Sequence, residues 1–147
     1  MSETNKDIIR RYQDAYNRND LDVLDEVLDP NWTTNAWPDL MPQTIEAAKE
    51  LYQILLASWP DAHYETLDLI AEGDKVVQHW KMRGTFKGEI FGLPPTGEMT
   101  EADGISIFRI ADGKIVEHWA FADDLGFWSQ LGAELPEFMA AVSHRSS

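Results

Sequence analysis

Residues 100–123, TEADGISIFRIADGKIVEHWAFAD, hold two runs of alternating apolar and polar residues on either side of Asp112-Gly113. A period of two residues is typical of β-strands, and an Asp-Gly pair between two such runs is a strong signal for a β-hairpin. We therefore expect antiparallel strands over residues 100–110 and 114–123.

Two more strands are expected upstream of this hairpin. Residues 63–71 and 75–86 also alternate, and Glu-Gly-Asp at 72–74 is expected to form the turn between them. The segment GEIFGLPPTGE at 88–98 is rich in glycine and proline, which predicts a loop before the third strand. The second half of the chain thus predicts four antiparallel strands.

The first third of the chain predicts helices instead. Apolar residues recur at helical spacing in three segments, with the first expected to end near Asn19 and the second at Pro30. The third helix is expected from about Thr44 to Ser58, and residues 31–43 are expected to be irregular.

These elements together predict an α+β domain that spans residues 1–147. The three N-terminal helices are expected to cover one face of a curved sheet and to enclose a pocket. A short helical tail is expected to begin at about Leu125.

Composition narrows the function classes. The chain has 147 residues, no cysteine and a formal net charge of −14, which disfavours disulfides, thiolate metal sites and nucleic-acid partners. The first residues lack the apolar core of a secretory signal, and no apolar run reaches the roughly 20 residues that span a bilayer, so a cytoplasmic protein without a membrane partner is expected. The four histidines lack metal-ligand spacing, so neither a metal nor a cofactor is expected.

Asp123 is the strongest candidate for a catalytic residue. In an unbroken strand, Asp123 shares a face with Trp119 and Phe121, and a carboxylate beside aromatic rings is a better base because it is partly desolvated. On the same parity, Asp124 points away from the pocket, although a β-bulge would change that parity. The alternative is that Asp123 caps the helix that follows it.

Aromatic side chains are expected to line the pocket, because ligand clefts favour such linings. Asn35 is added as a hydrogen-bonding residue, whereas His79 and His118 are expected to point away from the pocket. The residues expected to bind substrate are Trp32, Asn35, Trp37, Trp59, Trp80, Phe86, Phe91, Trp119 and Phe121.

Several motifs resemble those of the SnoaL-like polyketide cyclases, also called ester cyclases, in the superfamily of nuclear transport factor 2-like folds. They are GEIFGLPPTGE at 88–98, GISIFRIADGKIVEHW at 104–119 and QLG at 130–132, with Tyr-Asn-Arg-Asn-Asp-Leu at 16–21 near the N-terminus. The resemblance covers nearly the whole chain. The chain differs from the family pattern at Asn35 and Phe86, where the family often has histidine.

The resemblance implies a cone-shaped α+β barrel with an apolar cavity and ring closure by intramolecular aldol condensation without a cofactor. It also implies that Asp123, which follows Trp119 as the family aspartate follows its tryptophan, acts as the general acid and base on a small apolar carbonyl or polyketide substrate. Relatives form dimers or larger assemblies, so a homodimer is expected, with Val77, Ile105 and Ala120 among the contact residues. The alternatives are hydrolysis of the epoxide-hydrolase kind and a domain that binds a small molecule without catalysis.

Overall fold

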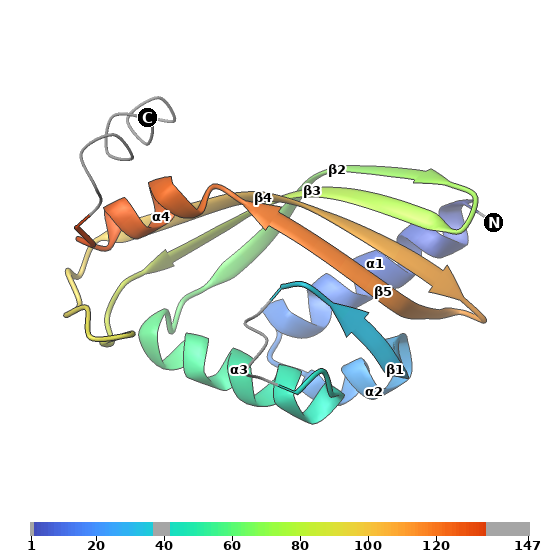
Figure 1. Ribbon diagram of the computed structural model, residues 1–147, viewed down its shortest axis with the longest axis horizontal. Helices are drawn as coiled ribbons and strands as arrows, with labels where there is room; N and C mark the ends of the chain where they lie inside the picture. The colour runs from blue at the N-terminus through green and yellow to red at the C-terminus, as the bar shows by residue number, and fades with distance from the viewer. Residues whose placement is uncertain (1, 37–41, 135–147) are drawn as a thin grey trace.

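The computed structural model describes residues 2–36 and 42–134 and has the α+β architecture expected from the sequence (Figure 1). In chain order, the described elements are α1 (Ser2–Asn17), a short 3-10 helix η1 (Leu21–Val23), α2 (Leu24–Val27), β1 (Leu28–Thr34), α3 (Ile45–Ser58), β2 (His63–Glu72), β3 (Lys75–Thr85), β4 (Met99–Ala111), β5 (Lys114–Ala122) and α4 (Asp124–Gln130).

The described strands form one curved sheet, which is not closed, in the order β1-β5-β4-β3-β2. Strands β2 to β5 are antiparallel neighbours, as predicted. Strand β1 was not predicted, and it pairs in parallel with β5 at the edge of the sheet. Its Pro30 was expected only to end a helix, but an edge strand tolerates proline because one side of that strand forms no ladder hydrogen bonds.

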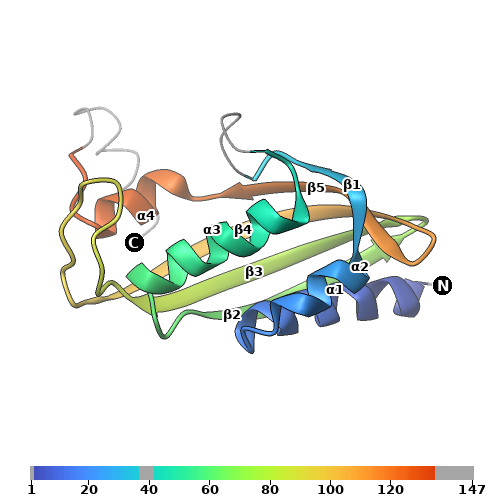
Figure 2. The ribbon, with the colours of Figure 1, turned by 90° about the horizontal axis from the view of Figure 1, so that it is seen from below.

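Helices α1 and α3 lie across the same face of the sheet, which is called the inner face below (Figure 2). Amphipathic spacing on α1 buries Ile9 and Ala15 against that face. Helix α3 begins at a cap, because the Thr44 side chain accepts a hydrogen bond from the Ala47 amide at 3.0 Å. No described helix is both long enough and apolar enough to cross a membrane.

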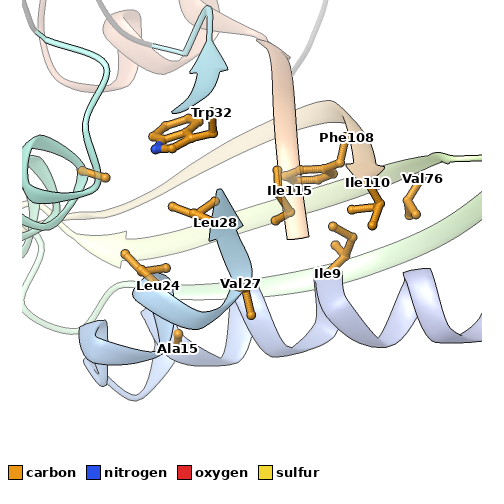
Figure 3. Close-up of a cluster of buried hydrophobic side chains, with 11 residues drawn as sticks. Ile9, Ala15, Leu24, Val27, Leu28, Trp32, Val76, Phe108, Ile110 and Ile115 are labelled. Carbon is orange, nitrogen blue, oxygen red and sulfur yellow. The ribbon is translucent and has the colours of Figure 1, made fainter. Parts of the chain in front are cut away.

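Two clusters of buried apolar side chains hold the helices to the sheet. The larger one lies between the N-terminal helices and the sheet (Figure 3) and contains Ile9, Ala15, Leu24, Val27, Leu28, Trp32, Ala48, Val76, Phe108, Ile110 and Ile115. The smaller one comprises Trp59, Phe86, Ile90 and Leu131 near the C-terminal end of α3. The aromatic pair in the smaller cluster is stacked, with ring centroids 5.5 Å apart.

A β-bulge interrupts β5 near its start. Ile110 pairs with Ile115, but the preceding residue Arg109 pairs with Glu117, so Val116 is the extra residue. One inserted residue exchanges the two faces of the strand beyond it. The prediction that Ile115 and Trp119 share a face is therefore wrong, because His118, Ala120 and Ala122 face inward instead.

Candidate active site

A cavity lies between the inner face of the sheet and α1 and α3. It has two adjoining compartments of about 370 and 280 Å³. Both compartments are lined by Ala36, Tyr52, Leu55, Tyr64, Trp80, Ala122 and Asp124. The first is called the polar compartment and the second the apolar compartment, according to their remaining lining residues.

Tyrosines dominate the polar compartment, since all four tyrosines of the chain, Tyr12, Tyr16, Tyr52 and Tyr64, line it. Tyr12 donates to the Tyr16 hydroxyl at 3.5 Å, and Tyr52 donates to the Tyr16 backbone carbonyl at 2.7 Å. Burial raises the pKa of Tyr12 to about 12 and also raises the pKa values of the other three. These phenols therefore stay protonated at neutral pH and act as hydrogen-bond donors.

Amide and hydroxyl groups line the same compartment from the sheet. The Gln78 Nε2 donates to Gln13 Oε1 at 2.7 Å and to Thr66 Oγ1 at 2.9 Å. Further along the sheet, Trp80 Nε1 donates to Ser106 Oγ at 3.0 Å, and His118 Nε2 lies 3.1 Å from the same oxygen. The network orients polar groups toward a buried space without placing a net charge there.

His118 is buried on the inner face, so the prediction that it points away from the pocket is wrong. The cause is the bulge, which shifts the alternation of β5 by one residue. Its ring stacks on Phe108, with centroids 4.5 Å apart and planes inclined by 9°. Burial lowers the pKa of His118 to about 4, so the imidazole is neutral at pH 7.

Asn35 lines the polar compartment and ties the end of β1 to β5. Its side-chain Oδ1 accepts from the Ala120 amide at 2.7 Å, and its own amide donates to the His118 carbonyl at 3.3 Å. Both bonds fix Asn35 beside the cavity. Its side-chain Nδ2 has no hydrogen bond to another described residue. This placement agrees with the expected hydrogen-bonding role, although the role itself stays a prediction.

The two aspartates after β5 lie on different sides of the chain. Asp123 is exposed, and its Oδ1 accepts from the Gly126 amide at 3.0 Å as the N-cap of α4. It borders a hollow of about 460 Å³ on the outer face of the sheet, whereas Asp124 lines both compartments of the inner cavity. The expectation that Asp124 points away from the pocket is therefore wrong, and a catalytic role for Asp123 stays a prediction.

The other expected binding residues divide between three places. Trp32 and Trp80 line the polar compartment, and Trp59, Trp80 and Phe91 line the apolar one. Phe86 is fully buried behind Trp59 and is not among the lining residues. Phe121 borders the outer hollow, Trp119 also belongs to the outer face, and Trp37 lies outside the described residues.

Sequence reasoning missed the tyrosines as lining residues, together with Gln78, Ser106 and Trp128. One usable signal was present, because Tyr12 and Tyr16 are four residues apart and must share a helix face. The others lie on α3, α4 and strands β2 to β4, so their access to the cavity depends on how these elements pack rather than on local spacing. Across residues 2–36 and 42–134, no three histidine, aspartate or glutamate side chains form a group that could hold a metal ion.

The fold and the tyrosine-rich cavity define a class of small α+β proteins with one pocket between a curved sheet and its helices. Within that class, the sequence model of the SnoaL-like polyketide cyclases matches residues 6–131, and the chain belongs to this family.

Named relatives agree with that assignment. Aklanonic acid methyl ester cyclase DauD from Streptomyces sp. (strain C5) is 31% identical over 136 residues, which cover 88% of this chain and 83% of the relative. The crystal structure of IdmH, a putative polyketide cyclase from Streptomyces antibioticus, superposes with a TM-score of 0.77 at 31% identity, covering 88% of this chain and 99% of IdmH. TsrD from Streptomyces laurentii gives a TM-score of 0.82 at 29% identity, covering 91% of this chain and 98% of TsrD.

Proposed function

We propose that the protein closes a ring in a small polyketide ester by intramolecular aldol addition inside the inner cavity. The observation that carries this proposal is the juxtaposition of one cavity-lining carboxylate, Asp124, with a compartment rich in neutral hydrogen-bond donors. Aldol chemistry requires a base near a carbon acid and donors near the oxygen where negative charge develops. Membership of a family of polyketide cyclases supports the same reaction class.

Asp124 is the proposed base, because it lines the cavity and therefore has access to a bound substrate. Asp123 was the base expected from the sequence, but its carboxylate already accepts a hydrogen bond from the Gly126 amide. In this scheme Asp123 fixes the start of α4 and so holds the neighbouring Asp124 at the cavity. The two roles are separable, because asparagine is also a good N-cap.

Tyr16, Tyr64 and Asn35 are the proposed donors to the substrate oxygens. Burial keeps both phenols protonated, and the Tyr64 hydroxyl has no hydrogen bond to another described residue. An enolate oxygen that accepts from such preorganised donors is strongly stabilised. This stabilisation lowers the barrier to removal of the proton by Asp124.

The reaction balances with groups of the chain alone. Asp124 removes a proton from the carbon between two carbonyls, and the resulting enolate carbon attacks a ketone carbon of the same molecule. A carbon–carbon bond forms, the ketone oxygen becomes an alkoxide, and the proton returns from Asp124 to that alkoxide. The product is a cyclic tertiary alcohol that retains its ester.

A homodimer through the outer face is part of the proposal. Ile70, Ile105 and Phe121 are 58%, 46% and 61% exposed there, and contiguous apolar surface of this kind favours association. Ile105 pairs directly with Phe121 across β4 and β5, so these two exposed side chains are adjacent. Val77 pairs with Ile107 on β4, and both face outward. Ala120 was also expected in the contact, but it lines the inner cavity instead.

The test uses aklanonic acid methyl ester as the trial substrate, with ring closure followed by chromatography and mass spectrometry. We expect the parent protein to convert it and Asp124→Asn to lose at least about 100-fold in kcat, the usual effect of removing a general base. Asp123→Asn is the matched control, and it should keep most of the activity.

Two outcomes would contradict the assignment. If Asp123→Asn abolishes turnover while Asp124→Asn retains it, the base is the residue predicted from the sequence. If the parent converts no trial ester and instead binds it unchanged, the domain is a small-molecule binder rather than an enzyme.

A further inference from the structure

Trp80 lies midway along the inner face of β3, at the junction of the two cavity compartments. The alternate inner positions of this strand are Gln78, Trp80 and Met82. Gln78 lines only the polar compartment, Met82 only the apolar one, and Trp80 lines both. The indole therefore stands where a long ligand would pass from one compartment to the other.

Two residues of β4 hold this indole in place. Gly104 pairs with Trp80, and a Cβ at position 104 would lie 2.4 Å from Trp80 Cζ2 and 2.8 Å from Cε2. The ring thus occupies the space above Gly104, and the side chain of any larger residue at position 104 would overlap with it. On the adjoining edge of the ring, Nε1 donates to Ser106 Oγ at 3.0 Å, and Ser106 is 3% exposed.

Tyr64 supports the indole from the neighbouring strand. The two rings meet edge to face, with centroids 6.2 Å apart and planes inclined by 61°. Three contacts from β2 and β4 consequently fix one side chain of β3. A tryptophan with so many constraints is a rigid wall, since indole has only two side-chain torsions to lose.

We propose that Trp80 divides the cavity and sets the size of the ring system that can span both compartments, with Gly104 and Ser106 as the residues that position it. The inference rests on the proposed function only in taking the cavity as the substrate site. Beyond that function, the inference identifies Trp80 as the side chain that selects among substrates by size. Tyr64 is the other large sheet residue that lines both compartments, and it packs edge to face on Trp80, whereas Ala122 of β5 is too small to select by size.

The selection can be measured by binding, without turnover. The probes are methyl 3-oxo-3-arylpropanoates that carry a phenyl, a 2-naphthyl or a 2-anthracenyl group, titrated by isothermal calorimetry. We expect Trp80→Leu to raise the affinity for the anthracenyl ester, relative to the phenyl ester, about tenfold over the parent, because size exclusion in an apolar pocket commonly reaches this range.

The positioning residues predict a second set of results. Gly104→Ala forces the indole out of its place and should move the same preference in the same direction while Trp80 is retained. Ser106→Ala should release the ring, and Ser106→Thr, which keeps the hydroxyl, should restore the parent preference. Trp119→Leu is the matched control, because it removes a tryptophan from the outer face and should leave the preference unchanged.

Circular dichroism and thermal unfolding verify that each variant is folded. The proposal is overturned if the ratio of anthracenyl-ester affinity to phenyl-ester affinity stays within about twofold of the parent ratio in all three variants, Trp80→Leu, Gly104→Ala and Ser106→Ala. A twofold change is a difference near thermal energy. It is also overturned if the parent binds none of the three esters. A parent that binds the series but does not cyclise aklanonic acid methyl ester refutes the cyclase assignment alone and leaves the role of Trp80 standing.

Discussion

His118 offers a direct test of how the polar compartment is built, because its burial should make the protein sensitive to mild acid. The side chain is 9% exposed and stacks on Phe108, and burial lowers its pKa from 6.5 to about 4. In the unfolded chain the imidazole is solvated and titrates near 6.5. Between these two values the unfolded state binds more protons than the folded state, so stability falls as the pH falls.

The magnitude follows from the two pKa values. One pKa unit corresponds to about 1.4 kcal/mol, so the full shift is worth about 3 kcal/mol once the pH is below 4. At pH 5 the imidazole of the unfolded chain is almost fully protonated and that of the folded chain is mostly neutral. The loss relative to pH 7 is then about 2 kcal/mol.

The assay is urea denaturation of the parent and of His118→Asn at pH 7 and pH 5. Asparagine keeps a polar group opposite Ser106 but does not titrate, so the loss of stability between the two pH values should be about 2 kcal/mol smaller in the variant. Acidic residues far from position 118 contribute equally to both proteins and cancel in the difference. His118→Gln should give the same difference, since only the titration is being removed. Equal losses in the parent and both variants would refute the buried, neutral imidazole.

Further predictions concern the helix cap and the outer face. Asp123→Ala should lower the free energy of unfolding by about 1 kcal/mol in urea titrations. Asp123→Asn should lower it by only a few tenths of a kcal/mol, because asparagine retains the N-cap hydrogen bond to Gly126. Equal losses in the two variants would refute the capping role. Phe121→Lys should convert a dimer to a monomer in sedimentation velocity without loss of secondary structure, and a parent that is already monomeric would refute association through this face.

The part of the fold that local chemistry controls could be predicted from the sequence. Asp112 and Gly113 have φ values of 51° and 76°, the left-handed backbone that a two-residue hairpin requires and that Asp-Gly adopts readily. Thr44 caps its helix as its residue type suggests. In both places the decisive interactions lie within a few residues of each other, so spacing and residue type suffice.

Tertiary pairing decides the features that could not be predicted. The residues around Pro30 predict a helix end followed by irregular chain, but they form a strand because they pair in parallel with β5 at the edge of the sheet. The bulge at Val116 is likewise a property of the β4–β5 ladder rather than of the local sequence. Its consequence was large, because the predicted pocket face of β5 became the outer face and Asp124 replaced Asp123 as the residue that lines the cavity.

The same bulge explains why there is a cavity at all. Gly104 pairs with Ala122, and Ser106 pairs with Ala120, so four small residues occupy neighbouring inner positions of β4 and β5. Without the extra residue, the alternation of β5 would turn Trp119 and Phe121 inward at this point. Two rings of 150–250 Å² each would then fill the space beneath α3. The bulge therefore moves the large rings to the outer face, where they favour association, and leaves small residues at these inner positions of β4 and β5, beside Trp80 of β3.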